Sequence, residues 1–235
     1  MTKQTKMLTV AGKNITCSFW TPTSAVDRKK AVIVAYGSMG MTGEFGAMIE
    51  RFCEGLCKKG YFVALPSYFE CSGTTPGMLA AASTNATFDK WVTCMSAATS
   101  WARTQTGTQA AALVGFSLGG NLVLKSALTF PVAAVVDFFG PIMLFEDAGS
   151  HALTSSRVAG LPKTQIHHGK ADSFVPLQIS SIVLQGWLNT AGVPNEVHFD
   201  YACGHPGDTT APKLDSAEEK QSLERTTGFL KGIWP

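Results

Sequence analysis

Residues 111–128 decide the fold; they read Ala-Ala-Leu-Val-Gly-Phe-Ser-Leu-Gly-Gly-Asn-Leu-Val-Leu-Lys-Ser-Ala-Leu. A short apolar run enters Gly-Phe-Ser-Leu-Gly and a helix-like segment leaves it, so a strand, a sharp turn and a helix follow one another with Ser117 at the apex. A β-carbon at Gly115 or Gly119 would collide across such a turn. The helix N-terminus would direct free N–H groups at whatever the serine attacks. We therefore interpret Ser117 as a nucleophile rather than as part of a plain strand-to-helix turn.

The segments on either side repeat this alternation of strand and helix. Residues 7–21 alternate loosely, which predicts a hairpin of two edge strands. Short apolar runs predict further strands at residues 31–35, 61–65, 132–139, 164–168 and 196–201. Apolar spacings of three and four predict helices around residues 45–58, 88–95, 179–192 and 216–230. The last of these helices is expected to open with a capping box, Ser216-Ala217-Glu218-Glu219.

Strands that alternate with helices of this length imply a mostly parallel sheet wrapped on both faces, a doubly wound α/β fold. In such sheets the functional residues gather at the carboxyl ends of the strands. Two excursions, residues 67–87 and 141–161, have no readable pattern. Because no linker, repeat or low-complexity tract interrupts the chain, we expect residues 1–235 to form a single domain.

The composition narrows the classes of protein that fit. Charged residues are 15% of the 235, below the roughly 25% of an average soluble protein, and the net charge of +2 comes without a basic cluster. We therefore expect neither a nucleic acid nor a membrane as partner. The most apolar segment, residues 132–145, is broken by Asp137, Gly140 and Pro141, which argues against a membrane span.

The N-terminus and the cysteines bear on the compartment. Lys13 and Asn14 interrupt the apolar residues near the N-terminus, so no secretory signal is expected. The six cysteines are scattered without zinc-like spacing, which favours free, mostly buried thiols in a reducing compartment. We expect a cytoplasmic protein, a monomer or small homo-oligomer. With no metal cluster and no phosphate-binding glycine loop in the sequence, we expect chemistry without a cofactor or a metal.

A serine hydroxyl is a weak nucleophile, so Ser117 needs a base, and the base needs an acid to orient it. Folds with this turn order the three as serine, acid and histidine, each just past a strand. Of the five histidines, His205 directly follows the last predicted strand, where a loop can reach over the sheet edge. The other four lie inside predicted strands or in an excursion. We therefore expect His205 to be the base.

Asp172 is the expected acid, because it follows the preceding strand and is separated from Ser117 and His205 by enough chain for a strand–helix unit in each interval. Asp137 is the rival, since some hydrolases place the acid one strand earlier, although it lies within its strand. A helix-capping aspartate ahead of Pro176 is the structural alternative for Asp172. We favour the role of Asp172 in a triad.

An acyl-transfer reaction also needs two backbone N–H groups to bind the oxyanion. The first is expected from Leu118, which follows the nucleophile at the start of a helix. The second is expected from the loop Gly37-Ser38-Met39-Gly40, where the glycines let the backbone approach closely. Ser38 is our choice and Met39 the near alternative, against the reading that these glycines only form a turn.

Together these motifs resemble the α/β-hydrolase superfamily. The resemblance rests on Gly115-Phe116-Ser117-Leu118-Gly119-Gly120, on His168-Gly169 followed by Asp172 and Val175-Pro176, and on Gly204-His205. Within the superfamily the chain is most similar to the dienelactone hydrolase family from about residue 7 to the C-terminus, being short and without a separate cap domain. The resemblance implies an eight-stranded sheet and a Ser117–Asp172–His205 triad.

Two departures from that family bear on the substrate. Dienelactone hydrolases proper use a cysteine where this chain has Ser117, and they hold an acidic residue where it has Gly37. Their anionic lactone is bound by arginines, one of them shortly after the catalytic histidine, whereas Pro206-Gly207-Asp208 follows His205 here and residues 67–87 contain no arginine. We therefore expect a serine hydrolase that cleaves a small neutral carboxylic ester through an acyl-enzyme intermediate. A lactone or a thioester is the alternative substrate.

A hydrolase-fold protein that binds a small ligand without turning it over is the alternative from another class, because a fold alone does not determine function. Cys203 is expected to be a small buried side chain rather than a second nucleophile. Several large residues are expected either at the mouth of an apolar pocket or in the core: Tyr36, Met39, Tyr68, Phe69, Met143, Leu144, Phe145, His151 and Phe174.

Overall fold

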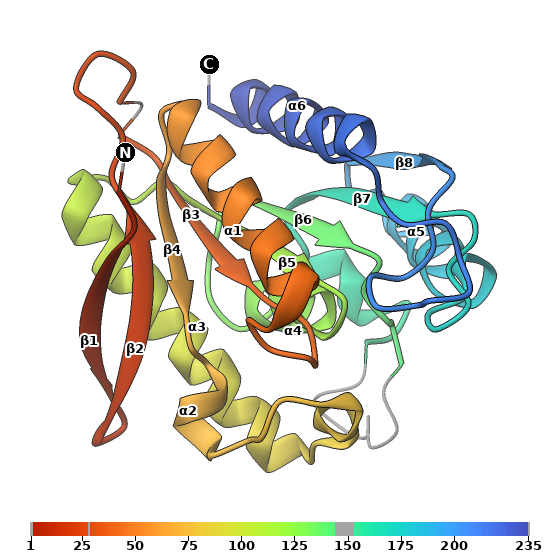
Figure 1. Ribbon diagram of the computed structural model, residues 1–235, viewed down its shortest axis with the longest axis horizontal. Coiled ribbons are helices and arrows are strands. Elements are labelled where there is room, and N and C mark those ends of the chain that lie inside the picture. The colour runs from red at the N-terminus through yellow and green to blue at the C-terminus, as the bar shows by residue number, and fades with distance from the viewer. Residues whose placement is uncertain (1, 28, 144–152, 235) are drawn as a thin grey trace.

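The computed structural model describes residues 2–27, 29–143 and 153–234, and an eight-stranded sheet forms its centre (Figure 1). In spatial order the strands are β1 (Gln4–Val10), β2 (Lys13–Trp20), β4 (Phe62–Pro66), β3 (Ala31–Ala35), β5 (Ala111–Phe116), β6 (Ala134–Phe138), β7 (Lys163–Gly169) and β8 (Asn195–Tyr201). The pairs β1–β2 and β2–β4 are antiparallel, and all other neighbours are parallel. The expected mostly parallel, eight-stranded sheet is confirmed.

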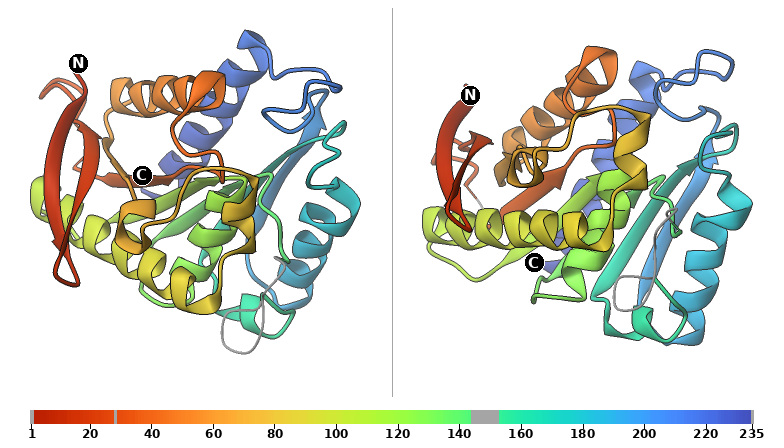
Figure 2. Two further views of the ribbon diagram at one scale, coloured as in Figure 1. Left: turned by 60° about the horizontal axis from the view of Figure 1, so that its bottom comes forward. Right: turned by 90° about the horizontal axis from the view of Figure 1, so that it is seen from below.

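Helices cover both faces of this sheet (Figures 1 and 2). One face carries α1 (Gly43–Lys58) and α6 (Ser216–Ile233), and the other carries α3 (Asn85–Thr106), α4 (Leu118–Ala127) and α5 (Ser181–Thr190). The remaining helical segments are short: α2 (Phe69–Ser72), η1 (Met78–Ala82), η3 (Arg157–Gly160) and η4 (Leu177–Ile179). This is the doubly wound arrangement of an α/β hydrolase, without a separate cap domain among the described residues.

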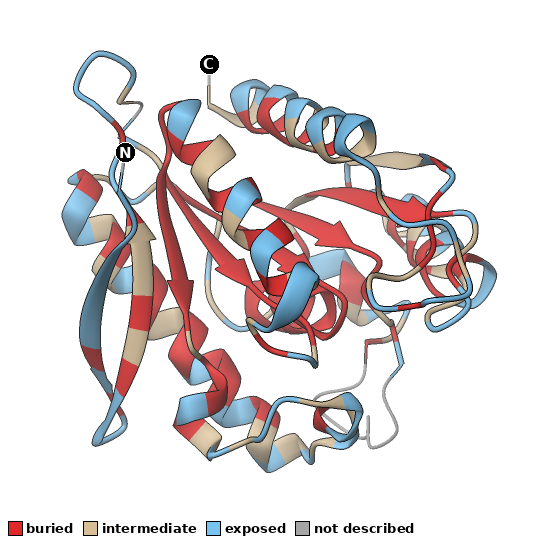
Figure 3. Ribbon diagram, viewed as in Figure 1, coloured by how far each residue is buried: buried red, intermediate tan, exposed pale blue. Residues whose placement is uncertain are grey.

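The core lies in the middle of the sheet, where every residue of β3, β4, β5 and β6 is buried (Figure 3). Short β-branched and small apolar side chains fill both faces of these strands, which suits strands packed between two helical layers. All six cysteines are buried and unpaired, as expected from their scattered positions. In the described part of the chain, no helix combines the length and apolarity needed to cross a membrane.

The excursion at residues 67–87 is more ordered than its sequence indicates. It contains α2, η1 and the first turn of α3, whose N-terminus is capped by Thr84 accepting a hydrogen bond from the Thr87 amide. A side-chain cap rather than an apolar stripe marks the start of α3, whereas α2 and η1 have no side-chain cap. The spacing of apolar residues predicted a helix only from residue 88, whereas α3 begins at Asn85.

Two helix predictions near the C-terminus need correction. Ile179 belongs to η4 rather than to α5, and both Ile179 and Ile182 are exposed, at 67% and 43%; α5 instead buries Ser181, Leu184 and Leu188. The cap of α6 is Asp215, whose carboxylate accepts from the Glu218 amide, so the capping aspartate precedes the predicted Ser216 by one residue. Aspartate caps a helix as well as serine does, and the spacing alone did not separate them.

The path of the chain creates a crevice at the centre of the sheet. After β3 it moves outward to β4, and it then returns to β5 on the opposite side of β3. The loops that follow the neighbouring strands β3 and β5 therefore run in opposite directions along the edge of the sheet. In open α/β sheets, ligands bind in the crevice between two such loops. These two loops contain residues 37–40 and Ser117.

Candidate active site

The turn at Ser117 holds a strained backbone. Ser117 has φ of 55° and ψ of −122°, a left-handed conformation that a residue with a β-carbon adopts at a cost. Two backbone hydrogen bonds secure it: the Ser117 amide donates to the Phe138 carbonyl at 2.9 Å, and the Gly120 amide donates to the Ser117 carbonyl at 2.7 Å. The strand end of β6 and the first turn of α4 thus fix the direction of the serine side chain.

The two glycines of the motif are required by close backbone contacts. A β-carbon at Gly115 would overlap the carbonyl of Gly119, and a β-carbon at Gly119 would overlap the carbonyl of Ala35 at the end of β3. Any larger residue would push α4 away from the sheet. The predicted collision across the turn is therefore confirmed at Gly115, whereas at Gly119 the close contact is with the end of β3 instead.

The structure brings the three predicted triad residues together. The Ser117 hydroxyl lies 2.9 Å from Nε2 of His205, and Nδ1 of His205 lies 2.7 Å from Oδ2 of Asp172. With a hydrogen on Nδ1, the imidazole donates to the carboxylate and accepts from the hydroxyl. The side chains of His205 and Asp172 are 9% and 1% exposed, so bulk water has little access to their contact.

The carboxylate of Asp172 is held by three hydrogen-bond donors and a further histidine contact. Oδ1 accepts from the amides of Phe174 and Val175 at 3.0 and 2.7 Å, and Oδ2 faces both Nδ1 of His205 at 2.7 Å and Nε2 of His168 at 3.4 Å. Burial by itself would raise the pKa of Asp172, but the contacts with His168 and His205 and the hydrogen bond from the Val175 amide outweigh it and hold the pKa well below its usual value. Asp172 is therefore ionised throughout the neutral range.

His168 is a part of this site that the sequence interpretation missed. It sits on β7 and faces α5, and both of its ring nitrogens are engaged: Nε2 donates to the Val175 carbonyl at 2.8 Å and Nδ1 contacts the Ser181 hydroxyl at 2.6 Å. The spacing of His168 and Asp172, four residues across the end of a strand, was the signal that could have linked them. Its place inside a predicted strand gives no indication of a contact with the acid.

The rival acid, Asp137, lies in a different environment. It is fully buried within β6, its Oδ1 accepts from the Gly140 amide at 3.0 Å, and no hydrogen bond joins it to His205. Burial raises the pKa of Asp137 to about 7, against the opposing effects of His168 and of the Gly140 amide. Its carboxylate contacts the first turn of α4, since a β-carbon at Gly120 would overlap it.

The expected oxyanion donors share one cavity with the nucleophile. Ser38, Met39 and Leu118 line the same space as Ser117 and His205. Among the described residues, no hydrogen bond uses the amide of Ser38, Met39 or Leu118, so all three N–H groups remain available to an oxyanion. The choice between Ser38 and Met39 stays a prediction.

This cavity has a volume of about 740 Å³, which lies in the range of small-molecule sites. Of the residues expected at its mouth, Met39, Met143 and Phe174 line it, whereas Tyr36, Tyr68 and Phe69 are buried in the core. Tyr36 and Tyr68 stack there at 4.3 Å, and the Tyr68 hydroxyl donates to the Tyr36 carbonyl at 2.8 Å. Three further expectations, Leu144, Phe145 and His151, fall outside the described residues.

Gly37 has no room for a side chain. A β-carbon there would lie 2.8 Å from Cε1 of Phe45 and 3.1 Å from Cβ of Ser117. An acidic residue at this position, as expected of dienelactone hydrolases proper, would require the Phe45 ring and the serine to shift. The backbone at residue 37 therefore packs directly against Phe45 and Ser117.

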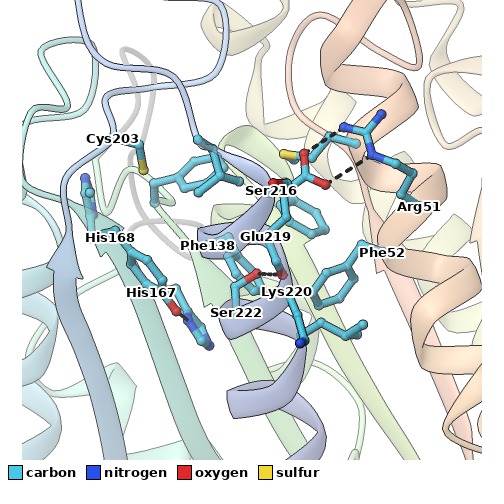
Figure 4. Close-up of a pocket in the computed structure, with 17 residues that line it drawn as sticks. Arg51, Phe52, Phe138, His167, His168, Cys203, Ser216, Glu219, Lys220 and Ser222 are labelled. Carbon is cyan, nitrogen blue, oxygen red and sulfur yellow. Dashed lines mark hydrogen bonds and ion pairs between the residues drawn. The ribbon is translucent and has the colours of Figure 1, made fainter.

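A second cavity, of about 230 Å³, lies between α1 and α6 (Figure 4). Phe52, Phe138, His167 and Cys203 contribute to its lining, and the ion pair between Arg51 and Glu219 lies at its edge. Neither Ser117 nor His205 reaches it. Burial raises the pKa of the Cys203 thiol to about 12, so this thiol is protonated and a poor nucleophile, in agreement with the expectation of a small buried side chain.

Both the sequence and the fold of this chain resemble those of known proteins. The sequence model of the dienelactone hydrolase family matches residues 15–233. No curated protein matches the chain. Three solved structures are similar to it in fold. Because the sequence identity to each of them is low, the similarity is one of fold alone.

A dienelactone hydrolase candidate from Klebsiella pneumoniae is 17% identical with a TM-score of 0.78, and 97% of each chain is covered. A serine hydrolase without a lid from Xanthomonas campestris is 17% identical with a TM-score of 0.66, covering 98% of this chain and 93% of its own. The esterase domain of a Rhodothermus marinus protein is 16% identical with a TM-score of 0.69, covering 97% of this chain and 98% of its own. The chain thus matches such folds over nearly its whole length.

Proposed function

The chain belongs to the dienelactone hydrolase family, whose members are hydrolases that act on ester bonds, and we propose that it is a serine hydrolase cleaving a small carboxylic ester. In this proposal Ser117 is the nucleophile, His205 the base and Asp172 the acid. The observation that carries it is the unbroken chain of contacts from the Ser117 hydroxyl through the His205 ring to the Asp172 carboxylate, at 2.9 and 2.7 Å.

The reaction would proceed in two halves. His205 takes the proton of Ser117 through Nε2 as the serine oxygen attacks the acyl carbon. The same nitrogen then protonates the departing alkoxide, which leaves an acyl-enzyme. A water molecule, activated by His205 in turn, attacks the acyl-enzyme and releases the acid and the free serine.

Groups around Ser117 would stabilise each charge that develops during the reaction. Asp172 stays ionised at neutral pH and so stabilises the imidazolium that forms on His205. The N-terminus of α4 supplies the Leu118 amide and a partial positive charge beside the oxyanion. The second donor would come from Ser38, with Met39 as the alternative. No ionisation of Cys203 enters the scheme.

The decisive experiment is a burst assay on a p-nitrophenyl ester. Wild-type protein is expected to release a stoichiometric burst of nitrophenol as the acyl-enzyme accumulates, and Ser117→Ala to lose both the burst and the turnover. Ser222→Ala is the matched control: Ser222 lies on α6 and donates only to the Glu219 carbonyl. Wild-type turnover by the Ser117→Ala variant would refute the proposal.

The same variants test the alternative substrates and the alternative that the protein binds a ligand without turning it over. A lactone and a thioester offered beside the ester separate these substrate classes by their kcat/KM values. A protein that only binds a ligand would leave Ser117 unlabelled by a fluorophosphonate while the ligand raised its melting temperature. The intact Ser117–His205–Asp172 contacts favour labelling.

A further inference from the structure

We infer that the 740 Å³ cavity beside Ser117 receives the acyl chain of the substrate, and that this chain is apolar and uncharged. The inference rests on the proposed function and narrows it to one class of substrate. It sets this protein apart from hydrolases whose substrate presents a carboxylate to the site.

The lining of the cavity supplies the first argument. Apart from Ser38, Ser117 and His205, which belong to the reaction itself, the described lining residues carry no polar side chain. Three methionines, Met39, Met78 and Met143, form much of the wall. Flexible thioether side chains adapt to apolar chains of different shape but offer a carboxylate nothing to pair with.

No lysine or arginine lines this cavity among the described residues. A carboxylate drawn into it would lose part of its hydration without gaining an ion pair from the wall.

The side from which His205 delivers its proton to the leaving group indicates that the acyl chain lies in this cavity. His205 must deliver its proton to the leaving oxygen, so the alkoxy group lies on the His205 side of Ser117. A neighbouring cavity of about 340 Å³ shares Met39, Phe45, His205, Pro206 and Gly207 with the first. Beyond them it is lined by apolar residues such as Met48 and Leu214 and by charged ones, including Glu44, Asp208 and Lys213. The acyl chain therefore extends the other way, toward Met78 and Ala81.

A matched pair of esters tests the inference: 4-nitrophenyl hexanoate and the mono-4-nitrophenyl ester of adipic acid. Their acyl chains have equal length and differ only in whether the far end is a methyl group or a carboxylate. We expect kcat/KM for the neutral ester to exceed that for the acidic ester by roughly 10-fold or more, because a carboxylate against this apolar wall is partly desolvated and has no partner.

Two adjacent substitutions on η1 provide the paired control. Both side chains are largely exposed, Met78 at 63% and Leu79 at 87%, but only Met78 lines the cavity. Met78→Lys is expected to improve the acidic ester relative to the neutral one by about threefold or more, the scale of one partly exposed ion pair. Leu79→Lys adds the same charge outside the cavity and is expected to leave the ratio unchanged.

The outcomes separate this inference from the proposed function. Equal turnover of the two esters by wild-type protein, with Ser117→Ala inactive on both, would overturn the inference and leave the serine mechanism standing. Equal shifts in Met78→Lys and Leu79→Lys would also overturn it, since a long-range charge effect would then explain the selectivity. Residual turnover in Ser117→Ala would instead reject the serine mechanism. Thermal melts of both lysine variants establish that they are folded.

Discussion

Nε2 of His168 lies 3.4 Å from Oδ2 of Asp172, the same carboxylate oxygen that Nδ1 of His205 contacts at 2.7 Å. The Val175 carbonyl, 2.8 Å from Nε2, can only accept a hydrogen bond, so this nitrogen of His168 carries the hydrogen. Nδ1 of the same ring contacts the Ser181 hydroxyl at 2.6 Å. The His168 ring thus joins β7 and α5 to the loop that holds the acid.

His168→Gln is expected to lower kcat by roughly tenfold and to leave KM nearly unchanged, because His168 orients Asp172 without lining the substrate cavity. The measurement is steady-state kinetics combined with the proton resonance of the His205 Nδ1–H hydrogen bond, which should move in the variant. Ser181→Ala, which removes only the hydroxyl that holds the ring of His168, should give a smaller loss. An unchanged kcat and an unchanged resonance would show that His168 serves packing alone.

Asparagine substitutions distinguish the two acids that the sequence left in competition. Asp172→Asn should reduce kcat/KM by about 10³-fold or more, since an amide neither stabilises the imidazolium nor holds the required tautomer of His205. Asp137→Asn should cost less than about tenfold, because Asp137 makes no hydrogen bond to His205. The reverse order of losses on the same ester would make Asp137 the acid of the site.

Asp137 also makes the stability of the protein depend on pH. Burial raises its pKa in the folded protein to about 7, above the value of roughly 3.9 in an unfolded chain. Since the folded state holds the proton more tightly, the wild-type protein loses stability as pH rises between these two values and reaches a constant penalty above about 7. Asp137→Asn cannot titrate, so its free energy of unfolding relative to wild type should rise over this range, by on the order of 4 kcal/mol.

Urea unfolding at several pH values between about 5 and about 8 follows the larger part of that rise, on the order of 2–3 kcal/mol. Asp200→Asn is the contrasting control, because a hydrogen bond from Arg225 lowers the pKa of Asp200 to about 2. Its contribution is present above the unfolded pKa and is lost only as pH falls toward about 2, so its effect should stay constant in this range. Parallel curves for Asp137→Asn and wild type would show that Asp137 ionises as freely as in water.

Two glycine-to-alanine changes should shift stability in opposite directions. At Gly115 a β-carbon meets the backbone of Gly119 and Gly120, which cannot move aside, so Gly115→Ala should lose about 3 kcal/mol or more and abolish turnover. At Gly186, on the exposed side of α5, a β-carbon meets nothing within 4 Å, so Gly186→Ala should gain roughly 0.5–1 kcal/mol with unchanged kinetics. Calorimetric melting of both variants tests the pair, and a stable, active Gly115→Ala would contradict the account of the turn.

Local patterns predicted the framework because each strand and helix carries its own apolar period. The runs at β3 and β5 are buried along their whole length, as strands between two helical layers must be. The same patterns did worse where side-chain caps define an element, as at α3 and α6, since one capping residue resembles another in sequence. They also misassigned Ile179, whose exposed side chain has no core to face.

The sequence by itself determined the strand–turn–helix at Ser117, because the contact that demands glycine at position 115 lies within five residues of it, whereas the contact that demands glycine at position 119 comes from the end of β3. It also singled out Asp172 and His205 by their places after successive strands. Only the tertiary structure decided that Asp172 rather than Asp137 meets His205, that His168 joins them, and that the cavity wall is apolar. Such contacts arise between segments far apart in the chain, where their distances depend on how the sheet twists and how the loops pack on it.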